Sequence, residues 1–331
     1  MTTMRLENKI LLLLTLLLVI IPVQAQNEST SVFNFLSLPT SAHTMALGGV
    51  QPALPDDDAS LLFQNPALMS DVSDRSINFS FLAWMKGSKA GNLSWTMASG
   101  DRGTWGVGAQ FVGYGSMKET TVEGIKMGDF GAIDLAFTGG YAYMLNDRLS
   151  GGALGKFIYS KYGQYSSVAL AVDLGLNYFV EESDFSLSLV AANLGWQVKP
   201  FGDTRERIPF DLRLGLTKRL ARAPIRFSFS MADLTRWKAS DFYSPDGEVK
   251  KGRILTNHFI VGIDVLITKQ IYVSGGYNFR RAYELKAAGS GHGAGLCFGA
   301  GVDIKRFKLG LAYAKYHVSI PGFMLTAQYH L

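Results

Sequence analysis

The last seven residues of the chain alternate strictly between apolar and polar side chains. From Leu325 to Leu331, apolar residues take the odd positions and polar residues take the even positions. Successive side chains of a β-strand point to opposite faces, so this pattern predicts a strand with one apolar and one polar face. The pattern recurs along most of the chain, and after residue 25 no run is apolar and long enough to cross a bilayer as a helix. A chain of this kind satisfies its backbone in a membrane as a closed β-barrel.

The composition agrees with a membrane barrel better than with a soluble protein. Of the 331 residues, 47% are hydrophobic and only 18% are charged, whereas about 25% charged residues are usual in soluble domains. A soluble β-sandwich, the rival architecture, shows similar alternation but needs more surface charge. The net charge of +5 is modest and the chain has no concentrated basic tract, so nucleic acid is not an expected partner.

Residues 1–25 have the pattern of a secretory signal peptide. Arg5 and Lys9 precede an apolar run from Ile10 to Ile21, and Val23-Gln24-Ala25 resembles a cleavage site. The alternative, a membrane anchor helix, needs roughly 20 apolar residues and this run is about half as long. We therefore expect a mature protein that begins near Gln26.

We expect residues 75–331 to form an antiparallel barrel of about fourteen strands. Short connections follow the even-numbered strands, whereas long connections follow strands 3, 7, 9 and 11. Outer-membrane barrels have short periplasmic turns and long external loops. The parity of the connections therefore places both ends of the barrel in the periplasm.

Residues 26–74 do not read as strands, because prolines, a Gly48-Gly49 pair and the acidic run Asp56-Asp57-Asp58 interrupt them. We expect a compact periplasmic or lumenal segment that precedes the barrel. The acidic run is either a cation site or a solvated turn or helix cap, and the spacing of a calcium loop is absent.

Several charged residues fall on the polar faces of the expected strands. They are Asp134, Lys156, Asp173, Arg213, Arg226 and Asp264. These residues either line a channel or pair with one another to fill the lumen, and pairing is favoured because a buried charge needs a partner.

No sequence motif of an enzyme or a cofactor site is present in the chain. The five histidines lack a His or Cys partner at metal-ligand spacing, and Cys297 is the only cysteine. The glycines around His292 lack the Lys-Ser/Thr of a phosphate loop and precede a strand, so they indicate an external loop. We expect neither catalysis nor a bound cofactor or metal.

Three segments carry a resemblance to a known family. The first is Ser41 to Gly49, the second is Asp57-Asp58-Ala59 with Gln64-Asn65-Pro66-Ala67-Leu68, and the third is Ala192-Asn193-Leu194-Gly195. These segments resemble the PorV/PorQ group of FadL-like outer-membrane barrels over nearly the whole mature chain. The length and the entry Phe33-Asn34-Phe35-Leu36 are most similar to the PorQ members, which belong to the type IX secretion system.

The resemblance implies a role in the attachment complex of the outer membrane. PorQ-like proteins anchor a PorZ-like surface protein, alongside PorU and PorV-like components. This complex receives secreted cargo, removes its C-terminal signal and joins it to lipopolysaccharide.

The long external connections supply candidate partner-binding residues, because aromatic residues and arginine are common anchors of protein interfaces. The candidates are Trp196, Phe201, Arg205, Arg207, Trp237, Phe242, Tyr243, Lys250, Lys251, Arg253 and Tyr283. The main alternative is a FadL-like transporter of hydrophobic small molecules. An apolar lumen pocket, or an opening beside the Gly113-Tyr114-Gly115 segment, would favour that alternative. A general porin is less favoured, because fourteen strands leave less room than sixteen or eighteen.

Overall fold

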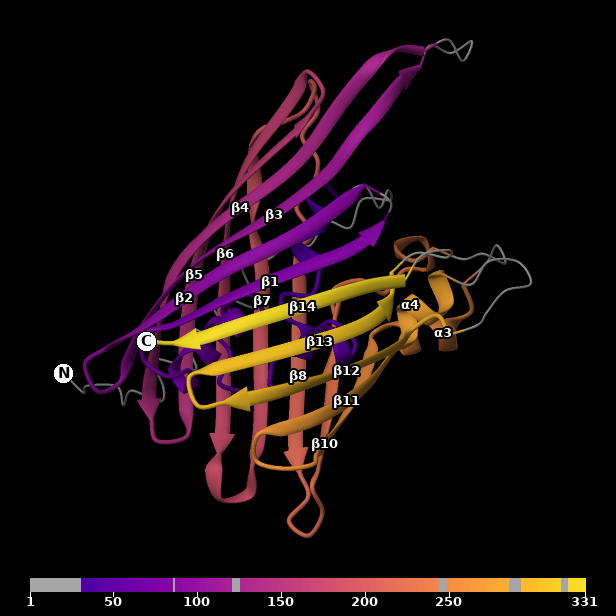
Figure 1. Cartoon of the computed structure of the whole chain (residues 1–331). Helices are drawn as coiled ribbons and strands as arrows, with labels where there is room; N and C mark the ends of the chain where they lie inside the picture. Colours follow the sequence, from indigo (N-terminus) through magenta and orange to yellow (C-terminus); the bar gives the residue numbers. More distant parts are fainter. Residues whose placement is uncertain (1–30, 86, 121–125, 244–248, 286–292, 317–320) are drawn as a thin grey trace, which may run out of the picture.

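The chain forms a closed antiparallel β-barrel of fourteen strands (Figure 1). The computed structural model describes residues 31–85, 87–120, 126–243, 249–285, 293–316 and 321–331. The barrel closes where β1 (Ser76–Met85) pairs with β14 (Pro321–His330), with Phe79 opposite Ala327. The predicted fold class is confirmed, and the expected signal peptide lies outside the described residues.

Each of the remaining twelve strands pairs with the strand before it and the strand after it in the sequence. These strands are β2 (Ser88–Ser99), β3 (Gly103–Thr120), β4 (Lys126–Asn146), β5 (Leu149–Tyr162), β6 (Tyr165–Val180), β7 (Phe185–Lys199), β8 (Asp211–Arg219), β9 (Ile225–Met231), β10 (Phe259–Leu266), β11 (Ile271–Asn278), β12 (Leu296–Ile304) and β13 (Phe307–Lys315). We call the end with the short connections, such as residues 100–102 and 147–148, the turn end, and the opposite end the loop end.

The alternation in the sequence is realised as an apolar outer face and a polar inner face. Phe79, Phe137 and Leu325 point outward with about half of each side chain exposed, whereas Asn78 and Ser80 are fully buried inside. In the described part of the chain, no helix combines the length and the apolar character needed to cross a membrane.

The wall of the barrel is uneven in height, as Figure 1 shows. The tall wall comprises β3 to β7 and reaches 21 residues in β4, whereas the low wall comprises β8 to β14 and has strands of 7 to 10 residues. With about 3.4 Å per residue and a tilt of about 40°, β9 rises roughly 18 Å against an apolar band of about 25 Å. The tall wall therefore extends beyond the membrane at the loop end, and the low wall does not.

Residues 31–75 fill the inside of the barrel, and we call them the plug. The plug has four short helices: η1 (Asn34–Ser37), α2 (Ala42–Ala46), η2 (Ala59–Phe63) and η3 (Pro66–Asp71). Polar residues of the sequence start three of them. Ser41 and Thr44 form a capping box on α2, while the side chains of Asp58 and Asn65 accept from Ser60 and Ala67 backbone N–H groups.

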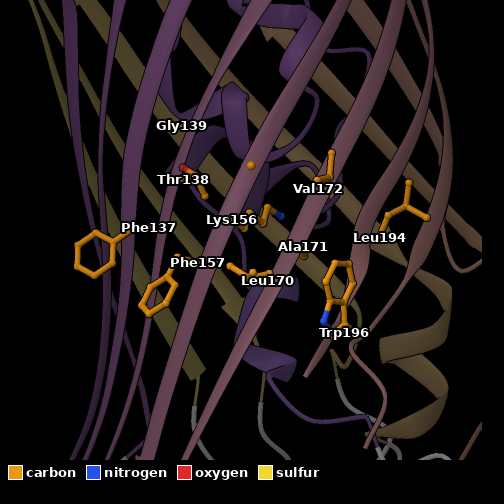
Figure 2. A pocket seen from close by; sticks show the side chains of 11 residues that line it. Phe137, Thr138, Gly139, Lys156, Phe157, Leu170, Ala171, Val172, Leu194 and Trp196 are labelled. Carbon is orange, nitrogen blue, oxygen red and sulfur yellow. The ribbon is translucent and has the colours of Figure 1, made fainter. Parts of the chain in front are cut away.

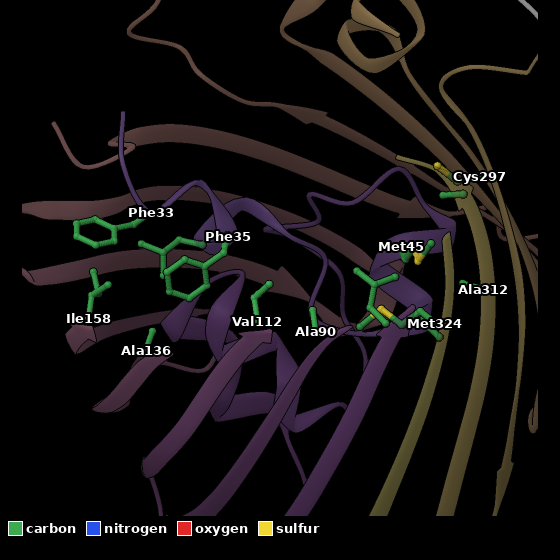
Figure 3. Close-up of a cluster of buried hydrophobic side chains, with 14 of the residues drawn as sticks. Phe33, Phe35, Met45, Ala90, Val112, Ala136, Ile158, Cys297, Ala312 and Met324 are labelled. Atoms are coloured by element: carbon green, nitrogen blue, oxygen red, sulfur yellow. The ribbon is translucent and has the colours of Figure 1, made fainter. Parts of the chain in front are cut away.

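The part of the lumen nearer the loop end holds an apolar cluster between plug and wall (Figure 3). Phe33, Phe35 and Met45 of the plug pack against wall residues such as Val112 and Ile158. Aromatic residues that are partly buried cover this cluster, and they are Trp84, Tyr114, Phe201 and Tyr316. The plug is thus held by hydrophobic contacts nearer the loop end.

Four connections differ from the sequence-based expectation. The long connection after strand 3 is mostly a β-ribbon, because β3 and β4 stay paired beyond the rest of the barrel up to Thr120 and Lys126. β7 continues past Gly195 to Lys199 instead of ending at the Ala-Asn-Leu-Gly segment. The two connections after β9 and β11 contain helices: η5 (Ala239–Asp241), α3 (Lys251–Asn257) and α4 (Phe279–Glu284).

Candidate functional site

Charged residues join the plug to the low wall in one buried group, which we call the ionic cluster. It consists of His43 and Asp56 from the plug, Arg226 from β9, Asp264 from β10 and Lys308 from β13. Arg226, Asp264 and Lys308 lie in the halves of their strands nearer the turn end. The ionic cluster therefore secures the plug at the end of the lumen opposite the apolar cluster.

His43 is the centre of the ionic cluster. Its Nδ1 lies 2.7 Å from Asp56 Oδ2 and its Nε2 lies 3.0 Å from Asp264 Oδ1. The imidazole also stacks on the ring of Tyr272, with the ring centroids 4.2 Å apart. A ring with a carboxylate at each nitrogen is best satisfied as an imidazolium, which donates from both nitrogens.

The charge of His43 follows from its neighbours. Burial by itself lowers the pKa of His43, but the carboxylates of Asp264 and Asp56 outweigh it, so the pKa is raised above the ordinary 6.5. Burial by itself raises the pKa of Asp56, but the positive charges of Lys308 and His43 hold the pKa of that carboxyl well below its usual range. Both shifts favour the charged form of the side chain.

The remaining carboxylate of the cluster is also fully engaged. Asp264 receives Nε and Nη2 of Arg226 at 2.8 Å and the hydroxyl of Ser274 at 2.5 Å. Arg226 in turn donates to the backbone carbonyl of Pro55 in the plug at 3.1 Å. Together with Ser274 of β11, the cluster joins four strands of the wall to two segments of the plug. Its ion pairs and hydrogen bonds therefore hold the plug against the wall.

The acidic run of the plug is not a solvated turn, but Asp58 is a helix cap, as the sequence also favoured, because its side chain accepts from the backbone N–H of Ser60. Asp56 pairs with Lys308 and His43, Asp57 accepts from Ser73, and Asp58 accepts from Asn78 of β1 at 2.8 Å. The run fastens the plug to the wall because Asp56 and Asp58 meet donors of the inner face, whereas Asp57 binds Ser73 within the plug. The local sequence does not show these partners.

The expected lumen charges are buried and paired. Lys156 lies 2.6 Å from Asp173, Arg213 lies 2.5 Å from Asp211, and Arg226 binds Asp264. Asp134 is the exception, because it accepts hydroxyl groups of Tyr114, Ser160 and Tyr162 instead of a cation. The prediction that these side chains fill the lumen by pairing is confirmed, with Asp134 satisfied by hydroxyls.

The Ala192-Asn193-Leu194-Gly195 segment forms a β-bulge in the middle of β7. Asn193 has a left-handed backbone with φ of 59°, and the register with β6 shifts there. Its side chain accepts from Lys156 Nζ at 2.8 Å and donates to the Pro209 carbonyl at 3.0 Å. A Cβ on Gly195 would overlap the backbone of β6. The segment therefore ties β5, β6 and the connection before β8 together.

A compact group of helices covers the low wall at the loop end, and we call it the cap. It comprises residues 232–243, 249–258 and 279–285 and includes η5, α3 and α4. Arg280 binds Asp233 at 2.5 Å and Glu284 at 2.8 Å, and its guanidinium lies over the ring of Phe242. The cap is therefore a folded unit.

The structure sorts the predicted partner-binding residues into two groups. One group lies on and after β7, and it comprises Trp196, Phe201, Arg205 and Arg207. The other group belongs to the cap, and it comprises Trp237, Phe242, Tyr243, Lys250, Lys251, Arg253 and Tyr283. The first group therefore borders the tall wall, and the second belongs to the cap.

Burial distinguishes surface residues from supporting residues in both groups. Arg205, Trp237, Tyr243, Lys250, Lys251 and Arg253 are exposed. Phe242 and Tyr283 are buried inside the cap, and Phe201 stacks on Tyr162 with the ring centroids 5.0 Å apart. Trp196 points outward from β7 with 63% of its surface exposed, so it belongs to the membrane-facing surface and not to a loop.

Two hollows of the described surface lie outside the lumen. A groove of about 550 Å³ crosses β4 to β7, where Phe137, Phe157 and Trp196 surround the paired Gly139 and Gly155 (Figure 2). A second groove of about 790 Å³ crosses β1 and β12 to β14. The hollow between the plug and β1 to β3 measures about 10 Å³.

The wall is continuous at the Gly113-Tyr114-Gly115 segment, which we considered as a possible opening. Lys89 of β2 and Ile133 of β4 both pair with Gly113, and pairing with β4 resumes at Ser116 after a bulge. Gly115 has φ of 74°, and a Cβ there would lie 2.9 Å from the carbonyl oxygen of Gly87. The glycine thus serves a close approach between the tip of the β1–β2 hairpin and β3.

Sequence reasoning missed His43 as a site residue and gave it no partner. The residue lies in a short helix of the plug, 221 positions before Asp264. Its place inside the resembling segment Ser41 to Gly49 was the available signal. The Gly48-Gly49 pair of that segment has φ values of 105° and 104°, and it turns the chain directly after α2.

Comparison with solved structures identifies a FadL-like fold. The structure is similar to the toluene transporter TbuX of Ralstonia pickettii, with a TM-score of 0.59 and 13% identity over 90% of this chain and 100% of that chain. It is also similar to the toluene transporter TodX of Pseudomonas putida, with a TM-score of 0.55 and 14% identity over 90% and 98% of the two chains.

A FadL homologue of Pseudomonas aeruginosa gives a TM-score of 0.52 and 12% identity over 88% of this chain and 98% of that chain. No protein-family model and no curated protein sequence matches the chain. At these identities the likeness concerns the fold. The chain has the FadL-like fold of an outer-membrane β-barrel.

Proposed function

We propose that this chain is an outer-membrane component of the type IX secretion attachment complex, where it anchors a PorZ-like surface protein through its external loops. PorU and PorV-like components would act beside it while cargo is processed and joined to lipopolysaccharide. The observation that carries the proposal is the large exposed surface that the tall wall and the cap form at the loop end, above a lumen that the plug occupies. The protein is then an anchor and not an enzyme.

The filled lumen favours an anchor. The plug meets the wall through the ionic cluster near the turn end and through the apolar cluster nearer the loop end. Breaking one partner of a buried ion pair costs about 3–5 kcal/mol, so displacement of this plug is expected to be unfavourable. A fixed plug gives a rigid base for a partner that sits on top of the barrel.

The loop end offers a surface suited to a protein partner. The tall wall rises beyond the membrane on one side, and the cap covers the low wall on the other side (Figure 1). Trp237 is 49% exposed and Tyr243 is 65% exposed on the cap, and Arg205 is exposed beside the tall wall. Exposed aromatic and arginine side chains of this kind are the usual anchors of an interface.

The family resemblance also supports the proposal, because its motifs have defined structural roles in the plug and in the wall. Gly48-Gly49 turns the plug against β10, Asn65 caps η3 and donates to Pro52, and Asn193 shapes β7.

Surface retention of the partner tests the proposal. A strain that lacks this chain is complemented with the wild type, with Tyr243→Ala and Arg205→Glu together, or with Arg222→Glu as a matched change at the turn end. We expect the double variant to release at least about tenfold more partner into the medium, because interface anchors often contribute 2 kcal/mol or more. The Arg222→Glu control should retain the partner. Partner that stays on the surface of the strain lacking this chain would refute the anchoring role.

Transport of small hydrophobic molecules is the second candidate, and the FadL-like fold favours it. The similar structures include proteins described as toluene transporters. A direct test measures uptake of a radiolabelled fatty acid and of toluene by the strain that lacks this chain. The anchoring proposal predicts uptake equal to that of the wild type, whereas a clear uptake defect with normal partner retention would favour the transporter.

A further inference from the structure

The cap presents an excess of positive charge. Its described residues include seven Lys or Arg side chains and three Asp or Glu side chains. Lys250, Lys251 and Arg253 fall within one turn at the start of α3, and all three are exposed. Lys250 and Arg253 are three residues apart and are therefore neighbours on the surface, and Lys251 lies between them in the sequence. We call these three residues the basic patch.

The acidic residues of the cap bind groups inside the cap. Asp233 pairs with Arg280 and Arg236, Glu284 pairs with Arg280, and Asp241 accepts from the backbone N–H of Lys238. Arg253 keeps an exposed side chain while its guanidinium lies 4.2 Å from the ring centre of Tyr283. The acidic groups are thus engaged within the cap, whereas all three side chains of the basic patch are exposed.

The outward aromatic side chains show where the membrane surface meets the barrel. Phe229 and Phe259 are in contact at the loop end of β9 and β10, and Tyr313 and Phe323 are in contact at the same end of β13 and β14. At the turn end, Phe307 meets Tyr329. Such aromatic rows lie at the two interfaces between membrane and water.

The helix that carries the basic patch at its start ends next to the outer aromatic row. Phe259 is the first residue of β10, and α3 ends two residues earlier at Asn257. Leu255 of α3 is 46% exposed, and Trp237 contacts His258 between α3 and β10. Because the low wall is shorter than the apolar band, the cap remains at the level of the lipid headgroups and does not rise into the solvent.

We propose that the basic patch binds the phosphate groups of an outer-leaflet glycolipid. Three adjacent cations complement the charge of a bisphosphorylated headgroup, and arginine and lysine both bind phosphate well. Leu255 and Trp237 would contact the boundary between the sugar and the acyl chains. The site requires no protein partner, so it goes beyond the anchoring function. The bound glycolipid would hold the cap at the membrane surface. The height of the tall wall above the membrane would then be fixed as well.

Native mass spectrometry of the purified full chain tests this site with bisphosphorylated lipid A as the probe. The test variant carries K250E, K251E and R253E. The control variant carries R222E, K269E and R306E, which are three exposed basic residues of the turn end. We expect the cap variant to bind lipid A at least about tenfold more weakly, because each Lys or Arg side chain near an anionic lipid surface adds to the binding free energy. The control should change the affinity less than about twofold.

Dephosphorylated lipid A distinguishes phosphate recognition from acyl-chain contact. It should bind the wild type and the cap variant equally, and a K250Q/K251Q/R253Q variant should be intermediate for the phosphorylated lipid. Unchanged affinity of the cap variant, or an equal loss in the control, would overturn the proposal. Normal lipid A binding together with loss of the surface partner would assign the patch to the partner instead. Because partner retention is measured separately, failure of the lipid site leaves the anchoring function unaffected.

Discussion

At the scale of single residues, His43 has the most consequential environment in the described lumen. It lies between Asp56 of the plug and Asp264 of the wall, with both ring nitrogens at hydrogen-bonding distance. An imidazolium in this position joins two negative charges that would otherwise repel each other. We therefore expect the charge state of His43 to affect how firmly the plug is held.

The plug is expected to loosen as the pH rises. The pKa of His43 is raised above 6.5 in the folded protein, so its contribution to stability is complete below pH 6.5 and is lost as the pH rises through the raised value. Asp264, Arg226 and Lys308 face the cluster from the wall and remain paired. Amide hydrogen exchange of residues 42–60, corrected for intrinsic rates, should show decreasing protection between pH 6 and pH 10.

A His43→Gln variant is the control for this pH dependence. Glutamine keeps hydrogen-bonding capacity but carries no charge, so protection should already be reduced at pH 6 and should lack the step. Protection of the wild-type plug that increases with pH would contradict the assignment of the charge.

Gly48 is expected to resist substitution for two separable reasons. Its φ of 105° disfavours a side chain by about 1–2 kcal/mol, and a Cβ would overlap Cγ2 of Ile260, which adds about 1–3 kcal/mol. Gly100 has φ of 67° but open space around it, so Gly100→Ala should show only the first cost. Urea unfolding in lipid vesicles compares the two variants, and equal losses would exclude the contact with Ile260.

At the scale of elements, the bulge in β7 explains how one motif organises the tall wall. Asn193 reaches Lys156 of β5 and Pro209 before β8, and its backbone N–H donates to Asp173 of β6 at 2.7 Å. After the bulge the inward positions change parity, so that Gln197 is buried while Trp196 and Val198 face outward. The motif therefore places Trp196 beside the outer groove.

Substitutions at Asn193 separate the side-chain bonds from the backbone conformation. Asn193→Ala should destabilise the barrel by about 2–4 kcal/mol, because it removes bonds to Lys156 and Pro209. Asn193→Gly loses the same bonds but tolerates the positive φ, so it should recover about 1–2 kcal/mol. The midpoints of urea unfolding measure both effects, and a glycine variant less stable than the alanine variant would disprove this explanation.

The sequence pattern predicts most of the strands, but it does not predict the short helices of the cap or the full length of the β3–β4 ribbon. Alternation is a local property, so Val168 to Tyr178 and the last seven residues indicate their strands directly. The α3 and α4 helices have only seven and six residues, which is too short for a reliable helical period. The length of the β3–β4 ribbon was also missed, because glycines interrupt its alternation.

The candidate site was less predictable than the fold for a physical reason. The charged lumen residues were recognised because they interrupt apolar alternation on strands. Their partners depend on which plug residue meets which strand, and contacts such as Lys308 with Asp56 span 252 positions. Strand periodicity places the wall residues, but it gives no information on how a non-repetitive plug docks against them.

At the scale of the whole molecule, the structure combines a filled barrel with an uneven outer end. The FadL-like wall and the ion-paired plug form the base. The tall wall and the cap form a surface that the short turns of the opposite end do not match (Figure 1). An anchor for a surface protein needs this combination of a rigid membrane base and a large exposed end.

The most direct measurement of the central claim is purification of the native protein from the outer membrane in a mild detergent, followed by mass spectrometry of what remains bound. The anchoring function predicts one surface-exposed, PorZ-like protein in stoichiometric amount, which is lost when the Tyr243→Ala and Arg205→Glu changes are combined. A barrel that purifies without any protein partner and carries only a fatty acid or a small hydrocarbon would contradict this function and would favour transport.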